Sequence, residues 1–309
     1  MKYALEIKNL TKRYKNFRAV NNLSLNVPEG KIYGFLGRNG AGKTTTIRMI
    51  MGLIKPDSGQ IHVLGKDIQQ NRLWGAKNIG SIIETPGFYE NLTAVENLDI
   101  TAAMFKVKKK RIAEVLDIVN LSSCETKKAR DFSLGMKQRL GIANALIHSP
   151  KILILDEPTN GLDPEGIRDM RDFLRMLSEK HGITVMISSH ILNEVQQIAD
   201  YAGIIDQGSL IEEMDIQSII EGNQSYLLLE VDNPQKTLAI LKDLGYKYLT
   251  EQDFIRVYCN KSCNSILNRK LVEANICVNS LSSISQTLEE RFLSIIAEKN
   301  TDGKEACNA

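Results

Sequence analysis

The fold is decided by the stretch Gly37-Arg38-Asn39-Gly40-Ala41-Gly42-Lys43-Thr44, which matches the P-loop pattern G-x-x-x-x-G-K-[ST]. An apolar segment, Ile32–Leu36, precedes it and predicts a strand, and Thr45–Met51 follows and predicts a helix. A glycine-rich turn formed by chance is the alternative, and the strand and helix on either side argue against it.

The P-loop predicts a site for a nucleoside triphosphate, and we expect ATP with Mg²⁺. Glycines let backbone N–H groups turn inward around phosphates, and the helix N-terminus adds positive potential. We expect Lys43 to contact the β- and γ-phosphates and the Thr44 hydroxyl to bind Mg²⁺. The nucleotide-binding residues expected here are Gly37, Arg38, Asn39, Gly40, Ala41, Gly42, Lys43, Thr44 and Thr45.

A second acidic site follows another apolar strand, Ile152–Leu155. Asp156 is placed to hold Mg²⁺ through water, as the acidic partner of a P-loop does. Glu157 then lies just past the strand end, where it can accept a proton from the attacking water. Acids that end a strand are more often a solvated turn, but the P-loop makes the catalytic interpretation the better one.

Composition describes an ordinary globular protein. The 309 residues are 43% hydrophobic and 25% charged, and 39 basic against 37 acidic residues leave a net charge of +2. This charge is too small to argue for a nucleic-acid partner. The sequence contains no run of about 18 apolar residues and so predicts no membrane span. The N-terminus lacks the apolar core of a signal peptide. Five cysteines favour a reducing, cytoplasmic compartment.

Residues 1–221 predict an α/β domain, because short strand patterns alternate with longer helical ones. Near-continuous apolar strands indicate a sheet that is covered on both faces. Besides the segments above, the expected strands are Leu5–Leu10, Leu23–Val27, Ile61–Val63, Thr184–Ile187 and Tyr201–Asp206, and the expected helices are Thr93–Val107, Lys109–Val119 and Gly135–Ile147. The last three fall within a helical subdomain expected at about residues 86–148.

Residues 222–309 predict a small α+β domain of the ferredoxin-like type. The order is β-α-β-β-α-β, followed by a helix at residues 285–299. The segments are Tyr226–Val231, Pro234–Leu244, Tyr246–Leu249, Phe254–Tyr258, Ser262–Ala274 and Ile276–Leu281. Cys259 and Cys263 form half of a metal site at most, and ordinary free thiols are the better interpretation.

Further motifs resemble those of ABC transporter ATP-binding subunits. Phe132–Arg139 (FSLGMKQR) is similar to the ABC signature, and Asn160-Gly161-Leu162-Asp163 is similar to the D-loop. His190, after the strand Thr184–Ile187, resembles the switch histidine. A narrower resemblance, to ATPases of bacitracin-resistance and lantibiotic-immunity exporters, is carried by residues 35–40, 86–89 and 132–140, and more weakly by the C-terminal region. The fold implied is an ABC-type P-loop ATPase domain with a mixed sheet and a helical subdomain.

The resemblance implies a head-to-tail dimer with two shared ATP sites. Ser133 and Gly135 would bind the γ-phosphate held by the P-loop of a second copy, although Ser133 could equally be a simple helix cap. His190 would contact the γ-phosphate and orient Glu157 and the water. Tyr14 would stack on adenine, with Phe17 as its competitor.

One departure from the family pattern concerns the residue before the helical subdomain. Glu84 stands where many ABC proteins have glutamine, and the narrower exporter group shares this glutamate. It keeps an oxygen for Mg²⁺ or the lytic water, but it adds a negative charge. In the signature, Leu134, Met136 and Lys137 replace commoner residues, whereas Ser133 and Gly135 are kept.

An ABC ATPase of this kind implies an integral membrane permease subunit as its partner. The resemblance places a permease helix at Pro86–Leu92, where Phe88 and Tyr89 either anchor it or pack inside the subdomain. The basic run Lys106–Arg111 is a solvated helix start or, less favourably, a contact for lipid headgroups. The expected location is cytoplasmic, on the inner face of the plasma membrane.

The favoured function is the ATP-hydrolysing motor of an exporter, for a peptide antibiotic of the bacitracin or lantibiotic type. A soluble ABC ATPase of DNA repair or translation is the alternative, but it would need a long heptad insertion or a second ATPase domain. A non-hydrolytic nucleotide sensor would not need Glu157 and His190. The sequence does not identify the transported substrate, the permease or the role of the C-terminal domain.

Overall fold

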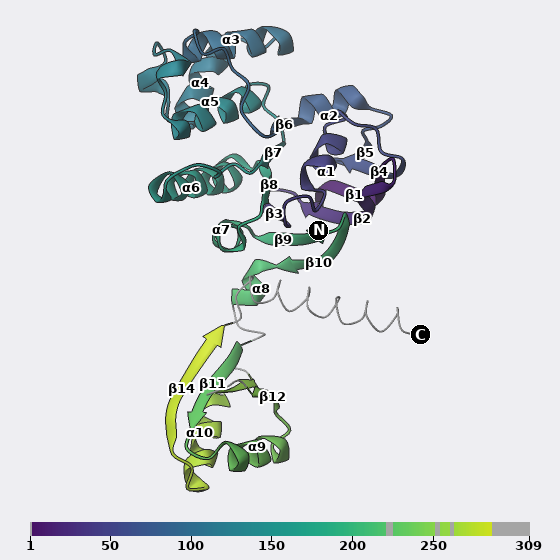
Figure 1. The fold of residues 1–309 in the computed structure, drawn as a ribbon. Coiled ribbons are helices and arrows are strands. Elements are labelled where there is room, and N and C mark those ends of the chain that lie inside the picture. The colour runs from purple at the N-terminus through teal and green to yellow at the C-terminus, as the bar shows by residue number, and fades with distance from the viewer. Residues whose placement is uncertain (1, 221–224, 251–253, 260–262, 286–309) are drawn as a thin grey trace. The chain divides into compact units, whose positions relative to one another are not determined.

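The structure is a computed structural model, and it describes residues 2–220, 225–250, 254–259 and 263–285 (Figure 1). The chain divides into two compact units, Met1–Met214 and Asp215–Ala309. The domain boundary expected after residue 221 falls among residues outside the described ones and stays a prediction. None of the helices in the described ranges is long and apolar enough to cross a bilayer.

An antiparallel sheet forms the N-terminal part of the first unit. Its strand order is β2-β1-β4-β5, with β1 (Tyr3–Tyr14), β2 (Phe17–Pro28), β4 (Ser58–Val63) and β5 (Lys66–Asp67). Leu5, Ile7 and Leu10 of β1 are buried in the core, whereas Lys8 and Asn9 are exposed. The two early antiparallel strands predicted from the sequence are confirmed, and both are longer than predicted.

The central sheet carries the P-loop. Its order is β10-β9-β3-β8-β7-β6, and every pair from β9 to β6 is parallel. The strands are β3 (Ile32–Leu36), β6 (Ile79–Ile82), β7 (Ile152–Asp156), β8 (Thr184–Ser189), β9 (Tyr201–Asp206) and β10 (Ser209–Asp215). Strands β3, β7 and β8 are buried at every position, which explains their continuous apolar sequence.

The turn between β9 and β10 makes this sheet mixed. Gln207 and Gly208 both have positive φ, at 45° and 79°, as the two-residue turn of a hairpin requires. Strand β10 therefore folds back beside β9. The predicted α/β class with a mixed sheet is confirmed.

Helices near this sheet position the site residues. They are α1 (Lys43–Ile50), α2 (Arg72–Asn78), α6 (Pro164–His181) and α7 (Leu192–Ile198). Helix α7 lies against β3 at Gly34, where an added Cβ would come 2.1 Å from Cγ1 of Val195. Only glycine allows this close approach.

A helical segment follows β6 and leads into β7. It contains α3 (Ala94–Phe105), α4 (Lys110–Ile118) and α5 (Leu134–Leu146), with two short 3₁₀ turns at Ser122–Cys124 and Ala129–Asp131 (Figure 1). The start of α3 is fixed by a capping box, in which Thr93 and Glu96 bond each other's backbone. Each of the three predicted helices is present, with ends that differ by one or two residues.

The second unit contains α8 (Ile216–Ile220) and a four-stranded antiparallel sheet in the order β12-β13-β11-β14. Its elements are β11 (Ser225–Val231), α9 (Pro234–Asp243), β12 (Lys247–Thr250), β13 (Ile255–Tyr258), α10 (Cys263–Glu273) and β14 (Val278–Ser285). This confirms the ferredoxin-like arrangement. The helix predicted at 285–299 lies outside the described residues, except for Ser285, which belongs to β14 and is not helical.

Candidate active site

The P-loop joins β3 to α1 and has the backbone that its glycines predict. Gly40 and Gly42 have φ of 83° and 108°, which is the region that favours glycine. An added Cβ at Gly40 would meet nothing within 4 Å, whereas one at Gly42 would lie 2.4 Å from the carbonyl oxygen of Ala19. Gly42 is also the N-cap of α1, so the helix N-terminus opens beside the loop. This geometry suits a bound phosphate chain.

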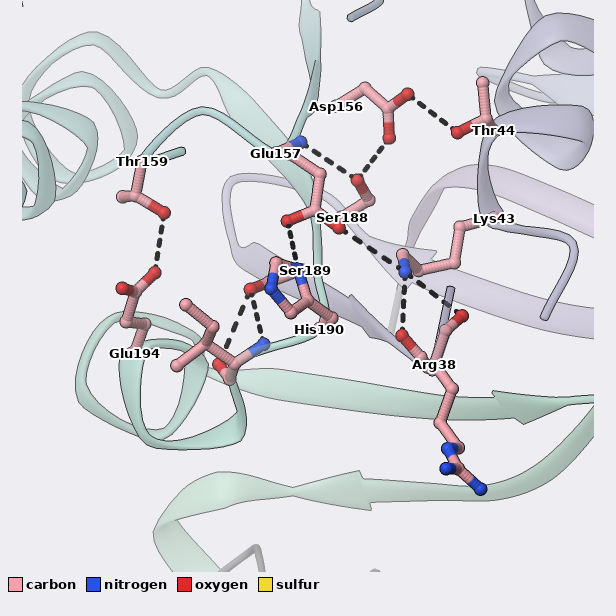
Figure 2. Close-up of polar contacts among 12 residues, drawn as sticks. Arg38, Lys43, Thr44, Asp156, Glu157, Thr159, Ser188, Ser189, His190 and Glu194 are labelled. Atoms are coloured by element: carbon pink, nitrogen blue, oxygen red, sulfur yellow. Dashed lines mark hydrogen bonds and ion pairs between the residues drawn. The ribbon is translucent and has the colours of Figure 1, made fainter. Parts of the chain in front are cut away.

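Lys43 is buried under the loop, with 6% of its surface exposed. Its ammonium group donates to the carbonyl of Gly37 at 2.7 Å and lies 3.4 Å from Oε1 of Glu157 (Figure 2). A buried ammonium with these partners is positioned to exchange one of them for a phosphate oxygen.

The two predicted magnesium ligands meet directly. The Thr44 hydroxyl donates to Oδ2 of Asp156 at 2.9 Å, and the hydroxyl of Ser188 donates to Oδ1 of the same carboxylate (Figure 2). Asp156 is 3% exposed. A buried carboxylate needs such donors to remain satisfied.

Glu157 contacts two other predicted site residues. Its Oε2 lies 2.9 Å from Nδ1 of His190, and its Oε1 faces Lys43 (Figure 2). Its φ of 51° is left-handed, which is uncommon for a residue other than glycine and typical of functional sites. The Glu157 N–H holds this turn by donating to the hydroxyl and the carbonyl of Ser188, at 3.0 Å and 3.2 Å.

A cleft of about 460 Å³ is lined by Lys43, Thr44, Asp156 and Glu157. Its walls also contain Arg38, Asn39, Gly40, Gly42, Thr45, Glu84, Thr85 and Asn160. A second hollow of about 800 Å³ shares the P-loop wall and includes Ala41 and His190. Phe17 lines both, whereas Tyr14 is not among the described residues that line either one.

Glu84 lies on the wall of the first cleft, where the sequence predicts it, and has a left-handed φ of 64°. Its carboxylate forms an ion pair with Arg48 of α1. Both side chains are partly exposed, so the pair can open at little cost. Glu84 thus lines the same cleft as the predicted metal ligands, but its carboxylate is paired with the Arg48 guanidinium.

The signature residues do not reach this cleft. Ser133 caps α5 by accepting a hydrogen bond from the Met136 N–H at 3.3 Å. Neither Ser133 nor Gly135 is among the described residues that line the cleft. Leu134 instead lies against the D-loop, since a Cβ on Gly161 would come 3.2 Å from its Cδ2.

Sequence reasoning missed two hydrogen-bonded partners of the site. One is Ser188, the hydroxyl between Asp156 and Glu157. The other is the pair Thr159 and Glu194, joined at 2.6 Å between the segment after Glu157 and helix α7 (Figure 2). The run Ser188-Ser189-His190 at the end of a buried strand was the available signal for the first of these.

The residues present fit magnesium and a nucleotide. Thr44 and Asp156 offer oxygen ligands, which Mg²⁺ prefers. Within the described ranges there is no group of three or more His, Cys, Asp or Glu residues able to hold a metal ion. The remaining ligands would therefore be phosphate oxygens and water, as at other magnesium–nucleotide sites.

Known proteins show which family combines these features. The family profile described as ABC transporter matches residues 20–160. The bacitracin transport ATP-binding protein BcrA of Bacillus licheniformis is 46% identical over 301 residues, which are 96% of this chain and 98% of that protein. The chain belongs to the ABC transporter ATP-binding family.

Other similarities agree with this membership. The lantibiotic transport ATP-binding protein SrtF of Streptococcus pyogenes is 45% identical over 211 residues, covering 68% of this chain and 90% of that protein. A solved dimer of the ATP-binding cassette MJ0796, in a post-hydrolysis state with ADP and phosphate, has a TM-score of 0.61. It is 27% identical and covers 69% of this chain and 98% of that one.

The resemblances to ABC ATPases, and to the bacitracin and lantibiotic group, are confirmed. The protein is an ATP-hydrolysing subunit of an ABC transporter. Cassettes of this family form dimers and work with membrane permease subunits. The roles of individual site residues stay predictions.

Proposed function

We propose that this ABC ATPase drives the export of a peptide antibiotic, of the bacitracin or lantibiotic type, and so confers resistance or immunity. The observation that carries the substrate class is the similarity to BcrA, which spans nearly the whole of both chains. Nothing in an ATPase subunit need contact the cargo, so the substrate class rests on this similarity.

The chemistry proposed is in-line attack of water on the γ-phosphate. Glu157 accepts the proton of the water, and His190 orients Glu157 through the contact at 2.9 Å. Lys43 stabilises the charge on the γ-phosphate. Thr44 and Asp156, with Glu84 nearby, would hold Mg²⁺, which would neutralise the negative charge that develops on the phosphate groups.

A second copy completes the site in this proposal. Ser133 and Gly135, at the N-terminus of α5, do not line the chain's own cleft, and both are at least partly exposed and so accessible to another molecule. Helix N-termini bind phosphate groups. In a head-to-tail dimer, each copy supplies a P-loop to one site and Ser133 and Gly135 to the other.

The proposed permease contact lies beside the site. A cleft of about 430 Å³ begins at Ile83 and Thr85, next to Glu84, and continues along Pro86, Phe105 and His148. Tyr89, two residues after the lining residue Gly87, is 64% exposed, which supports a role as an anchor for a permease helix. This partner would hold the subunit on the inner face of the plasma membrane. We propose no nucleic-acid partner.

The catalytic assignment is tested with the Glu157→Gln variant. We expect it to bind ATP, to dimerise with ATP, and to lose hydrolysis by about 10²- to 10⁴-fold. Phosphate release measures hydrolysis, and size-exclusion chromatography in the presence of ATP measures dimerisation. Normal turnover would remove Glu157 from the role of the base.

The transport assignment needs cells. A strain lacking this gene should become more sensitive to bacitracin or to a lantibiotic, and the wild-type gene, but not Glu157→Gln, should restore resistance. Unchanged sensitivity to both peptides would reject the substrate class. If the protein then sediments with ribosomes or DNA, the exporter function fails as a whole.

A further inference from the structure

We infer that Ser188 is a positioning residue for hydrolysis, whose single hydroxyl sets the catalytic glutamate relative to the magnesium carboxylate. The inference rests on the roles proposed above for Asp156 and Glu157. It adds a specific cause for their alignment, in a buried residue that is not among those lining the described cleft.

The position of Ser188 follows from the sheet. Strands β7 and β8 are parallel neighbours, and Asp156 pairs in register with Ser188. Ser188 is fully buried. Its hydroxyl donates to Oδ1 of Asp156 and accepts the N–H of Glu157 at 3.0 Å (Figure 2). One oxygen therefore contacts both consecutive acidic residues.

The direction of these hydrogen bonds is unambiguous. An ionised carboxylate only accepts, a backbone N–H only donates, and a serine hydroxyl has one hydrogen. The hydroxyl hydrogen of Ser188 must therefore point at Asp156, and a lone pair of the same oxygen must accept the hydrogen bond from the Glu157 N–H. This leaves Oδ2 of Asp156 free to face Thr44, which is the side on which the metal would bind.

The same hydroxyl supports an unfavourable backbone. Glu157 has a φ of 51°, a conformation that persists only where its surroundings hold it. Its N–H is shared between the hydroxyl and the carbonyl of Ser188, so loss of the hydroxyl leaves one backbone hydrogen bond at 3.2 Å. The turn would then remain folded, but its angle would be less strictly fixed. The carboxylate depends on that angle for its contacts with Lys43 and His190.

Removal of the hydroxyl has two expected consequences. Asp156 would lose a donor to a buried oxygen and could rotate, which weakens Mg²⁺ binding. Glu157 would lose its alignment, and a displacement of the order of 1 Å lowers rates by about 100-fold. A merely structural serine would instead lower stability and nucleotide binding together.

The experiment compares Ser188→Ala with Ser189→Ala in the full-length protein. Ser189 is the buried neighbour on the same strand, and within the described part of the chain its hydroxyl forms hydrogen bonds with the backbone of Ile191 alone. For Ser188→Ala we expect kcat to fall by about 10- to 100-fold, with KM for ATP changed by less than about 2-fold. The Mg²⁺ concentration for half-maximal activity should rise several-fold. Ser189→Ala should remain within about 3-fold of wild type in all three values.

A matched pair separates the hydroxyl from its shape. Thr and Val have nearly the same shape, but only Thr keeps the hydroxyl, so Ser188→Thr should be clearly more active than Ser188→Val. If Thr and Val are equally impaired, or if Ser188→Ala hydrolyses ATP like wild type, the inference is overturned. It is also overturned if Ser188→Ala raises KM in proportion to the loss of kcat.

The double variant Ser188→Ala/Glu157→Gln distinguishes this inference from the proposed function. At saturating Mg²⁺, where the weaker metal binding no longer limits the rate, we expect no further loss of kcat beyond that of Glu157→Gln, because both changes then act through the same base. If Glu157→Gln abolishes hydrolysis and Ser188→Ala has no effect, only the positioning role fails. If Glu157→Gln is fully active, the assignment of the base fails, whatever Ser188 does.

Discussion

Oε2 of Glu157 and Nδ1 of His190 lie 2.9 Å apart, although the two residues are 33 positions apart in the chain. Because a carboxylate only accepts, Nδ1 must carry the hydrogen. The ring is therefore oriented by Glu157, and its Nε2 is the nitrogen left for the phosphate side.

This contact predicts different effects for two substitutions of His190. His190→Ala removes the donor to Glu157, and we expect kcat to fall by about 100-fold. His190→Asn can place an amide N–H near the former Nδ1 and should retain more activity than His190→Ala. Steady-state phosphate release measures both. Equal loss in the two variants would show that the donor to Glu157 is not what matters.

Two aromatic residues are candidates for the contact with adenine, Tyr14 and Phe17, which face each other in the pairing of β1 with β2. The resemblance assigns stacking to Tyr14, whereas Phe17 lines the cleft wall. Stacking on a base is worth about 1–3 kcal/mol, so loss of the stacking ring should raise the Kd about 10-fold or more. We expect this for Tyr14→Ala, and a smaller change for Phe17→Ala. Titration with a fluorescent ATP analogue would detect the reverse order, which would assign the role to Phe17.

Glu84 and Arg48 provide a test of charge near the metal. Glu84→Gln removes a negative charge and should raise the Mg²⁺ concentration needed for half-maximal activity. Arg48→Met frees the Glu84 carboxylate and should lower the Mg²⁺ concentration needed for half-maximal activity. Neither change should alter the free energy of unfolding by more than about 1 kcal/mol, because both partners are partly exposed. Shifts of the two variants in the same direction would contradict a metal role for Glu84.

Gly34 tests how α7 is seated on the sheet. A Cβ there would collide with Val195, so Gly34→Ala should lower the free energy of unfolding by about 1–3 kcal/mol. Val195→Ala should restore part of this loss in the double variant. Gly87→Ala is the control, since an added Cβ at Gly87 meets nothing within 4 Å. Thermal denaturation measures all four proteins, and an additive double variant would contradict the steric explanation.

Asp57 predicts a pH dependence of stability near the turn of the β1–β2 hairpin. Its carboxylate accepts from the Arg13 N–H at 2.6 Å and from Lys12 at 3.0 Å. The hydrogen bond from the Arg13 N–H, and then that from Lys12, hold the pKa of Asp57 below its ordinary value. The stabilisation is therefore complete above the pKa of a free aspartate, about 4, and is lost as the pH falls below it.

The Asp57→Asn variant tests this dependence. It should have a lower Tm than wild type at pH 7, and the difference should shrink as the pH falls from about 5 to about 3. A difference that stays constant over this interval would mean that the charge of Asp57 does not contribute.

The P-loop and the acidic strand end could be predicted because their chemistry depends on contiguous residues. Gly42, Lys43 and Thr44 must follow one another for a loop to enclose phosphates and open a helix. Asp156 and Glu157 likewise mark the end of one buried strand. The signature and the switch histidine needed the family resemblance, since Ser133 or His190 alone has a structural interpretation.

The rest depends on contacts between distant segments. Ser188 reaches Asp156 only because β8 is inserted between β3 and β7 in the sheet, and strand order is not a property of any one segment. Gly34 has its role only because α7 packs on it. Helix α6 is a different case, because Asp163, Pro164 and Gly182 mark its two ends in the sequence. This helix is not among those predicted from the sequence, although its signals are local.

The hydrogen bond between Thr159 and Glu194 closes a ring around the catalytic pair. From Glu157 the chain leads to Thr159, across to Glu194, back along the chain to His190, and through its imidazole to Glu157 again. A ring of this kind transmits displacement, because no member can move without the next. The segment after Thr159 enters the D-loop, whose Gly161 lies against Leu134 of the signature. Because the signature is proposed to complete the site of a second copy, this ring would join the groups proposed to activate water in one site to the segment that completes the other.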